Sequence, residues 1–356
     1  MKNIIFICQA VDKKDPLLSA TVNWIKEFSY RPEVNNLTVL TLRAGEFSLP
    51  DNVEVRVVKR GNKLFTLLAF YKEVIKRLKE TNLYFVHMGG PYPLLLMPFK
   101  LLGKEIYQWK THSYISPLMK FQARFCDNKI FTATPSSFAM NLDKVRVIGH
   151  GIDENLFRIS SVEKQADLIT TGRYSPVKDL DKILELVAKY NEKFNQPLVT
   201  NFYGPTLEND KQFKNDLVDQ RENLALANQA FFRGPIKQDQ LPALLNQHKI
   251  FVSFNTGGLD KAVLEGMACG LPVLTPNQCV AEILPDHLRA LLIVNKDDLE
   301  DQVSKLNRLL TLSDQERLSL GEELRAIVKR GHTTTMLVDK IFSDTRGQTK
   351  QEQDFE

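Results

Sequence analysis

"NTGGLDKAVLEGMACGLPV", residues 255–273, joins a glycine-bearing loop to a short helix that ends abruptly. Residues 262–269 have the composition of a buried helix, and Gly270 follows where a left-handed C-terminal cap belongs. Gly257 and Gly258 stand just before the helix begins. Because unpaired backbone N–H groups point outward at a helix N-terminus, the stretch predicts an anion-binding site.

Three charged residues, Asp260, Lys261 and Glu265, lie at the start of this helix and just inside it. We expect backbone N–H groups around Lys261 and Ala262 to hold the anion. Glu265 lies one turn deeper, where a carboxylate can accept hydrogen bonds from the hydroxyls of a ribose. A buried glutamate paired with Lys261 would give the same pattern, and these residues alone do not decide between the two.

Apolar runs of strand length alternate with helical patterns along the whole chain, which is typical of α/β proteins with parallel sheets. The expected strands of the first half are 4–8, 37–42, 53–58, 83–87, 105–109, 129–133 and 145–149. Those of the second half are 167–172, 198–204, 230–234, 249–254, 271–276 and 290–294. Leu180, Ile183, Leu184 and Val187 follow the i, i+3, i+4, i+7 spacing of an amphipathic helix.

A polar stretch without periodicity, residues 158–167, separates the two halves. The sequence therefore predicts two doubly wound, Rossmann-like domains, 1–158 and 159–330, with a cleft between them. We expect a last helix, 331–344, to return to the first domain. The polar tail, 345–356, is expected to be disordered.

The composition excludes several classes of protein. With 47 basic and 43 acidic residues, the net charge of +4 is too small to indicate a nucleic-acid partner. The apolar run 4–8 is too short for a signal peptide, and stretch 83–103 is too often interrupted to span a membrane. The four scattered cysteines fit reduced thiols: Cys8, Cys126, Cys269 and Cys279. We expect a cytoplasmic protein, at most peripheral to the cytoplasmic membrane face.

The strand ends of the second half carry further glycines and cations. Gly172 and Arg173 end one strand, and Lys178 follows just before a helix. Two cations and a helix N-terminus at one strand end suit a diphosphate, although two solvated cations on the surface would give the same sequence. Three turn residues end neighbouring strands and either contact a nucleobase or form plain turns: Gly204, Arg233 and Gly234.

Three segments, 170–184, 231–245 and 257–273, resemble in order and spacing the donor-binding half of the family 4 retaining glycosyltransferases of the GT-B fold. In the first half, "WKTHSY" (109–114) and "VRVIGHGID" (145–153) stand where that family has its cleft histidine and its strand-to-linker motif. The resemblance implies the GT-B architecture, in which two Rossmann-like domains face each other across a cleft.

The resemblance also implies roles for individual residues. In that family the Gly-Arg…Lys motif binds the donor diphosphate, which here points to Arg173 and Lys178. The second glutamate of a Glu–seven residues–Glu motif holds the ribose and matches Glu265. His112 matches the histidine that reaches the donor sugar and its leaving phosphate, although a lone histidine is more often structural.

At one position the chain departs from the family. The first glutamate of the motif, which contacts the donor sugar, would stand at position 257, where this chain has glycine. Asp260, Lys261 or backbone N–H groups would then take over that contact. Because Gly258 follows at once, we expect Gly257 to have a positive φ, so that any side chain there would destabilise the loop.

The first half offers candidates for the acceptor side. His87 ends an expected strand directly before Gly89 and Gly90. The glycine pair that the family often has after its first strand is replaced here by residues 8–16, "CQAVDKKDP". Acceptor handling is therefore expected to differ from the common pattern.

The resemblance implies a retaining, hexosyl-transferring enzyme of bacterial cell-envelope polysaccharide synthesis. Its donor would be a UDP- or GDP-linked sugar, its acceptor a glycan or a lipid-linked molecule, and no metal or other cofactor would be required. A GT-B nucleotide-sugar epimerase and a sugar-binding protein without activity remain as alternatives. A dinucleotide oxidoreductase would need G-x-G-x-x-G after a strand, and the strand ends here lack it.

The predicted helix 62–80 combines an apolar stripe with basic residues, which suits the surface of an anionic bilayer. A packed helix with a solvated basic face would look the same. The basic residues are Lys63, Lys72, Lys76, Arg77 and Lys79.

Overall fold

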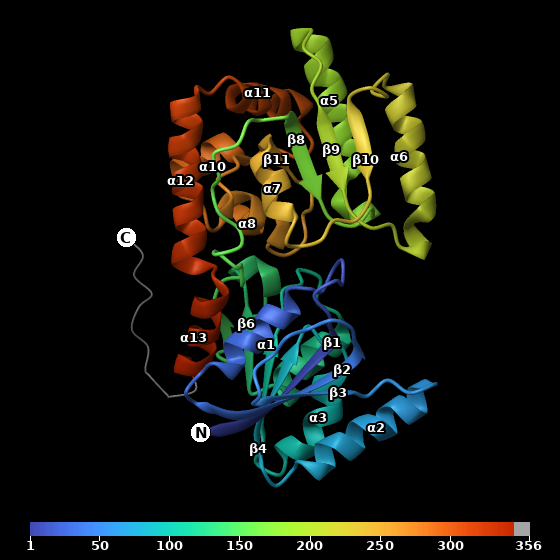
Figure 1. Ribbon diagram of the computed structural model, residues 1–356, viewed down its shortest axis with the longest axis vertical. Helices are drawn as coiled ribbons and strands as arrows, with labels where there is room; N and C mark the ends of the chain where they lie inside the picture. The colour runs from blue at the N-terminus through green and yellow to red at the C-terminus, as the bar shows by residue number, and fades with distance from the viewer. Residues whose placement is uncertain (345–356) are drawn as a thin grey trace.

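The computed structural model describes residues 1–344, which form two α/β domains arranged along the long axis of the molecule (Figure 1). The strands of the first domain are β1 (Lys2–Val11), β2 (Val34–Ala44), β3 (Val53–Val57), β4 (Thr81–His87), β5 (Glu105–Trp109), β6 (Lys129–Thr132) and β7 (Val145–Val147). They form one parallel sheet in the order β3-β2-β1-β4-β5-β6-β7.

The second domain has a smaller parallel sheet. Its strands are β8 (Ala166–Thr171), β9 (Thr200–Tyr203), β10 (Ala230–Arg233), β11 (His248–Val252) and β12 (Val273–Leu274), in the order β10-β9-β8-β11-β12. In both sheets the order reverses beside the first strand, between β1 and β4 and between β8 and β11. Ligands bind doubly wound sheets at this switch point, beyond the carboxyl ends of the strands. The predicted α/β class is confirmed.

Helices cover both sheets. Those of the first domain are α1 (Thr21–Ser29), α2 (Lys63–Lys76), α3 (Tyr92–Lys100) and α4 (Pro117–Phe121), which continues into a π-helical turn (Gln122–Cys126). Those of the second domain are α5 (Leu180–Phe194), α6 (Lys211–Asn223), α7 (Leu241–Asn246), α8 (Lys261–Ala268), α9 (Gln278–Ala281), α10 (Asp286–Leu292), α11 (Leu299–Leu310) and α12 (Asp314–Gly331). The last helix is α13 (Thr334–Asp344).

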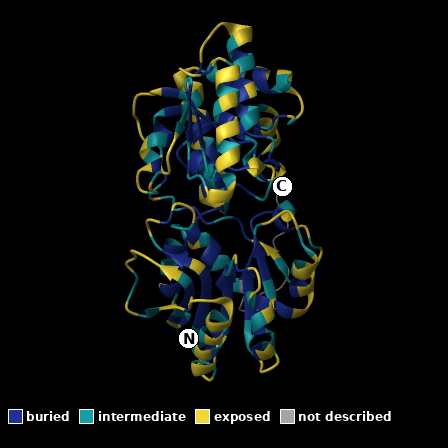
Figure 2. Ribbon diagram, turned by 90° about the vertical axis from the view of Figure 1, so that its right-hand side faces the viewer, coloured by how far each residue is buried: buried dark blue, intermediate teal, exposed yellow. Residues whose placement is uncertain are grey.

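The core follows the apolar pattern of the sequence. Side chains from Ile4 to Cys8 on β1 are at most 1% exposed, because helices cover both faces of a parallel sheet. Figure 2 shows the strands buried and the outward faces of the helices exposed. The predicted stripe on α5 is buried as well, including Ile183 and Val187. Helix α8 ends as predicted, with Gly270 at φ 74°.

One predicted strand is wrong. Most of residues 290–294 belong to helix α10, and only a single bridge, between Thr275 and Ile293, has strand character. Leu288 and Leu292 lie four residues apart and are both buried. The apolar run therefore belongs to a helical period, which its short length concealed.

The chain crosses between the domains twice, and the two crossings touch. Ile152 in the connecting segment donates its N–H to the carbonyl oxygen of His332 at 2.8 Å. Thr334 returns a hydrogen bond to the carbonyl of Ile152 at 3.0 Å. Beside them Gly149, at φ 89°, lies so close to Gly331 that an added Cβ would be 1.9 Å from the Gly331 oxygen.

Helices α12 and α13 carry the chain back to the first domain (Figure 1). Helix α12 packs against α8 of the second domain, and α13 packs against α1 of the first. The ring centroids of Phe28 and Phe342 are 5.4 Å apart in this second contact. The predicted tail 345–356 lies outside the described residues. Within residues 1–344, no helix is both long and apolar enough to cross a membrane.

Candidate functional site

A cavity of about 400 Å³ lies between the two domains. The loop after β1 lines one side, and the ends of β8 and β9 and the start of α8 line the other. Both walls come from the carboxyl ends of strands, at or beside the switch points of the two sheets. The lining residues are Pro16, Leu17, Ser19, Ala20, Thr171, Gly172, Arg173, Lys178, Tyr203, Gly204, Pro205, Ile236, Gln238, Leu241, Asp260, Lys261, Ala262 and Glu265.

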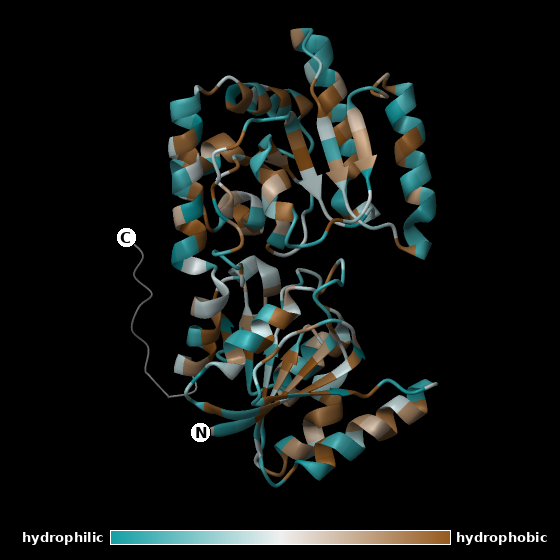
Figure 3. Cartoon of the chain, in the orientation of Figure 1, coloured by the Kyte–Doolittle hydropathy of each residue, from teal (hydrophilic) through white to brown (hydrophobic). Residues whose placement is uncertain are grey.

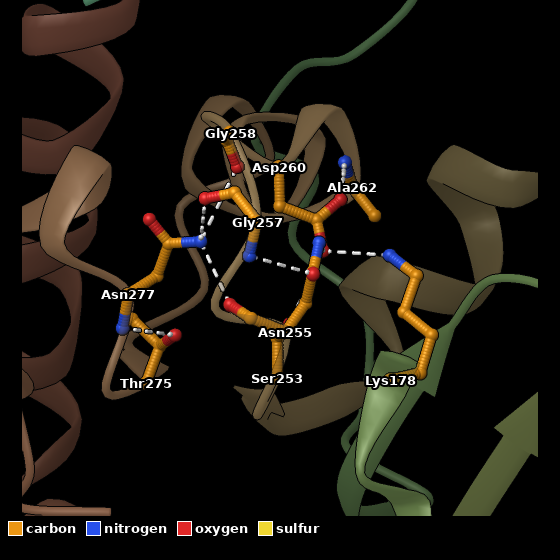
Figure 4. A network of polar contacts seen from close by, with 9 residues as sticks. All are labelled: Lys178, Ser253, Asn255, Gly257, Gly258, Asp260, Ala262, Thr275 and Asn277. Atoms are coloured by element: carbon orange, nitrogen blue, oxygen red, sulfur yellow. Dashed lines mark hydrogen bonds and ion pairs between the residues drawn. The ribbon is translucent and has the colours of Figure 1, made fainter. Parts of the chain in front are cut away.

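Asp260 is the centre of a polar network on the second-domain wall (Figure 4). Its Oδ2 accepts hydrogen bonds from Lys178 Nζ at 2.9 Å and from Asn255 Nδ2 at 3.1 Å. Ser253 Oγ donates to the same oxygen at 3.2 Å. Its Oδ1 accepts from the backbone N–H of Ala262 at 3.2 Å, so Asp260 is also the N-cap of α8. The network fixes Lys178 against the start of the helix. It also occupies the Ala262 N–H, so the expectation that this group holds the anion is wrong.

The charge on Asp260 is stabilised despite its burial. Burial by itself raises the pKa of this carboxyl, but the nearby Lys178 ammonium opposes it most strongly. Hydrogen bonds from Lys178, Asn255 and the Ala262 N–H oppose it further, so the pKa lies below its ordinary value. Lys178 is therefore held in place by a counter-ion, and Arg173 lines the same wall of the cavity.

Glu265 and Lys261 form an ion pair one turn inside α8. The Glu265 side chain is 6% exposed, and Lys261 is 31% exposed. Burial raises the pKa of Glu265, although Lys261 counteracts part of the increase. Both residues line the cavity. The alternative of a buried glutamate paired with lysine is thus observed, and the same carboxylate also faces the site.

Gly257 does not have the predicted backbone conformation. Its φ lies outside the left-handed region, and an added Cβ would meet only the side chain of Asn255, at 3.1 Å from Oδ1. Two amides fix the loop instead. Asn255 Oδ1 accepts from the Gly257 N–H at 3.0 Å, and Asn277 Nδ2 donates to the carbonyl of Asn255 at 2.7 Å (Figure 4). The expectation that any side chain at 257 strains the loop is therefore wrong.

Of the two adjacent glycines, Gly258 is the one that has no room for a side chain. An added Cβ would lie 2.8 Å from Thr111 Oγ1 and 3.1 Å from the Thr111 carbonyl oxygen, in the first domain. Its neighbour Leu259 donates its N–H to Ser137 Oγ of that domain at 3.0 Å. The predicted His112 follows Thr111 and is exposed, but it is not part of the described lining of the cavity. The loop thus joins the domains beside the cavity.

The end of β8 at Gly172 and the end of β9 at Gly204 lie close to each other. Gly172 has φ 142°. A Cβ added at Gly204 would lie 1.7 Å from the carbonyl oxygen of Gly172. The buried Tyr174 hydroxyl connects this loop to two neighbouring strands, since its single proton lies between the carbonyl oxygens of Phe202, 2.7 Å away, and Arg233, 2.8 Å away. The two glycines therefore let the backbone line the cavity.

Two predicted donor residues lie just outside this lining. The Arg233 side chain donates to Asn201 Oδ1 at 3.2 Å, and its guanidinium carbon lies 4.8 Å from the ring centre of Phe231. Gly234 accepts a hydrogen bond from the Gly204 N–H at 3.2 Å. In the described residues, the cavity is lined by the nearby Ile236 rather than by these two.

The acceptor-side candidates lie at the carboxyl end of β4. His87 packs in an aromatic cluster, with ring centroids 4.8 Å from Trp24 and 5.9 Å from Phe6. Burial lowers the pKa of His87 to about 4, so its ring is neutral at pH 7. The carbonyls of Gly89 and Gly90 accept hydrogen bonds from buried glutamines. The glutamine contacts fix the loop after β4. The His87 ring packs among aromatic side chains of the first domain.

Sequence reasoning missed Ser253, Asn255 and Asn277 as parts of the site. Asn255 follows strand β11 and Asn277 follows β12, so each stands at a carboxyl strand end. That position was the available signal. The contact of Asn277 with Asn255 joins segments 22 positions apart, which no local pattern reports.

The second domain matches a known protein family. Residues 151–326 match the family described as glycosyl transferases group 1. A search of curated protein sequences found no match.

Solved structures share the fold over nearly the whole chain. HepE of Anabaena, in a complex with UDP and glucose, has a TM-score of 0.77 at 14% identity, covering 98% of this chain and 100% of HepE. Sucrose-phosphate synthase of Thermosynechococcus elongatus has a TM-score of 0.74 at 14% identity, with 97% and 98% covered. TarM of S. aureus has a TM-score of 0.72 at 11% identity, with 96% and 98% covered. The two-domain arrangement is therefore the GT-B fold.

Proposed function

Because the chain carries a group 1 glycosyltransferase domain at residues 151–326, we propose that it is a retaining glycosyltransferase that moves a hexosyl group from a nucleoside diphosphate sugar. One observation supports this most directly. Arg173, Lys178 and the N-terminus of α8 meet in the interdomain cavity, with the Glu265 carboxylate one turn behind them.

In this proposal the bond between the anomeric carbon and the diphosphate oxygen breaks, and the diphosphate leaves with the electron pair. A hydroxyl oxygen of the acceptor bonds to the anomeric carbon on the same face, and its proton passes to the departing phosphate. Arg173, Lys178 and the positive end of the α8 dipole stabilise the developing negative charge. His112 approaches the sugar from the first domain, and the facing walls limit hydrolysis by water.

The proposal is tested by the slow hydrolysis of the donor. UDP-glucose and GDP-mannose are each incubated with the protein and followed by proton NMR. We expect release of the sugar first as the α anomer, together with UDP or GDP. First release of the β anomer would contradict retention. Formation of a new nucleotide sugar would identify an epimerase, and binding without turnover would identify a binding protein.

We also infer that Glu265 binds the ribose of the donor. Glu265→Gln keeps one acceptor and loses the charge, so UDP binding should weaken by about 1 kcal/mol, and Glu265→Ala should weaken it by about 1–3 kcal/mol. Calorimetry measures both. Inorganic diphosphate, which has no ribose, is the control ligand and should bind wild type and Glu265→Gln alike. Equal losses for UDP and diphosphate would mean that Glu265 acts only through Lys261.

The proposed chemistry needs no divalent ion, since fixed cations and backbone dipoles oppose the charge of the leaving group. Donor turnover should therefore be unchanged by EDTA. A requirement for added Mg²⁺ would contradict this part of the proposal.

For the acceptor, we propose a glycan or lipid-linked molecule of cell-envelope synthesis, handled by the first domain at the cytoplasmic membrane face. Helix α2 supports this, because it exposes Lys63, Lys72 and Lys76 together with apolar side chains. Arg77 has a different role from the one its sequence position indicated. It is half-buried and pairs with Glu54 and Glu73.

A further inference from the structure

A second cavity, of about 410 Å³, lies in the first domain between the start of α2 and the start of α3. It opens at the carboxyl ends of β1 and β2, on the same sheet edge as the loop that lines the donor cavity. Its lining residues are Gln9, Leu42, Arg43, Lys59, Arg60, Gly61, Asn62, Lys63, Thr66, Leu67, Phe70, Pro91, Tyr92 and Leu95.

The floor of this cavity is apolar. Phe70 is 1% exposed and packs on Tyr92, with ring centroids 5.3 Å apart. Leu42, Leu67 and Leu95 complete the floor. The walls therefore suit hydrocarbon, which loses contact with water when it enters such a cavity.

The rim carries four cations, Arg43, Lys59, Arg60 and Lys63, and the described lining contains no carboxylate. Arg43 pairs with Asp15. For the other three, no ion pair is found within residues 1–344. Their charges are therefore available to an anionic ligand.

Helix α2 contributes both positive potential and apolar surface to this cavity. Its N-terminus, where Asn62 caps the Phe65 N–H at 3.0 Å, points positive backbone dipoles toward the rim. Its first turns also expose Leu64, Phe65 and Leu68, with exposed fractions of 61%, 57% and 56%. Figure 3 shows hydrophobic and hydrophilic residues side by side along this helix. Apolar surface thus continues from the floor of the cavity to the outside of the helix.

We propose that this cavity binds the phosphate group and the first part of the hydrocarbon chain of an anionic lipid. Lys59, Arg60 and Lys63 have no carboxylate partner in the described residues, although Arg60 also donates to the carbonyls of Val57 and Lys59. Such cations around an apolar floor fit a ligand that is charged at one end and apolar at the other. The ligand class rests on the proposed function, because a lipid phosphate here would carry the acceptor group toward the cleft.

The test uses dihexanoyl phosphatidic acid below its micelle concentration, in calorimetry with the full chain. Two control ligands separate the contributions of charge and chain. Glycerol phosphate has the anion without hydrocarbon, and dihexanoyl phosphatidylcholine has the hydrocarbon without net charge. We expect binding of phosphatidic acid and at least about tenfold weaker binding of both controls. Equal binding of glycerol phosphate would show a simple anion site, and equal binding of phosphatidylcholine a simple apolar groove. Either result overturns the proposal.

Variants locate the site. Lys59→Ala/Arg60→Ala should weaken binding of phosphatidic acid by at least about tenfold, because two charged contacts are lost. Lys329→Ala/Arg330→Ala removes one lysine and one arginine from the exposed end of α12 in the second domain, and should leave binding of phosphatidic acid unchanged. Equal losses in the two double variants would indicate general attraction to the surface and overturn the assignment.

UDP binding is measured on the same samples. A protein that binds UDP but not phosphatidic acid would refute the lipid site and leave the proposed function standing. Binding of phosphatidic acid without binding of UDP or GDP would refute the proposed function instead. The two failures are therefore distinguishable.

Discussion

Lys178→Ala is expected to weaken binding of UDP or GDP by about 10- to 150-fold, or about 1.5–3 kcal/mol, the range of a hydrogen bond to a charged group. The same change removes the counter-ion of Asp260, whose side chain is 8% exposed. The fold should therefore lose about 2–3 kcal/mol as well. This is less than the ~3–5 kcal/mol of a fully buried pair, because Lys178 is 18% exposed.

A double variant separates the two effects. Asp260→Asn in the Lys178→Ala background removes the unpaired charge and keeps the oxygen that caps Ala262. Calorimetry and thermal denaturation should show stability restored toward wild type while nucleotide binding stays weak. Lys189→Ala, which breaks an exposed pair with Glu192, is the matched control and should change neither. Unchanged UDP and GDP binding in Lys178→Ala would remove Lys178 from the donor site.

The second large effect is expected at Gly258. Gly258→Ala places a methyl group against the hydroxyl and the backbone carbonyl of Thr111, and should cost about 1–3 kcal/mol. Because Thr111 belongs to the facing domain, donor turnover should fall with stability. Gly257→Ala is the control, since only the Asn255 side chain has to shift, and its melting temperature should stay near that of wild type.

Two further variants sharpen this comparison. Thr111→Ala in the Gly258→Ala background removes the nearest atom and should restore part of the stability. Gly257→Glu, which installs the acid that the family has at this position, is expected to fold normally and to retain turnover. If Gly257→Ala lowered the melting temperature as far as Gly258→Ala, the assigned difference between the two glycines would be incorrect.

Most of the fold was predictable because buried parallel strands leave continuous apolar runs in the sequence, as in β1. The run at 290–294 misled because five apolar residues fit either a strand or part of a helix. Leu288, just before the run, supplies the helical spacing. The pairing order of the strands needed the structure, since no local pattern encodes it.

The site was predictable where one segment supplies both the chemistry and its geometry, as at Lys261 and Glu265 in one helix. It was not predictable where distant segments share a contact. Asn277 contacts a loop 22 positions earlier, and Gly257 in that loop does not have the left-handed conformation that two adjacent glycines indicated. The ion pair between Lys178 and Asp260 spans 82 positions, so its effect on stability could not be anticipated either.

The contact between the two crossings of the chain has a mechanical consequence. Ile152 and Thr333 run side by side, and Gly149 touches Gly331 without room for a side chain. The two chain crossings therefore lie together at one edge and form a covalent hinge, while the loop at Gly258 meets Thr111 of the first domain through non-covalent contacts alone. If the second domain turns, residues near this hinge hardly move, while those far from it travel furthest. A substitution at Gly149 would thus act on the opening of the cleft without touching either cavity.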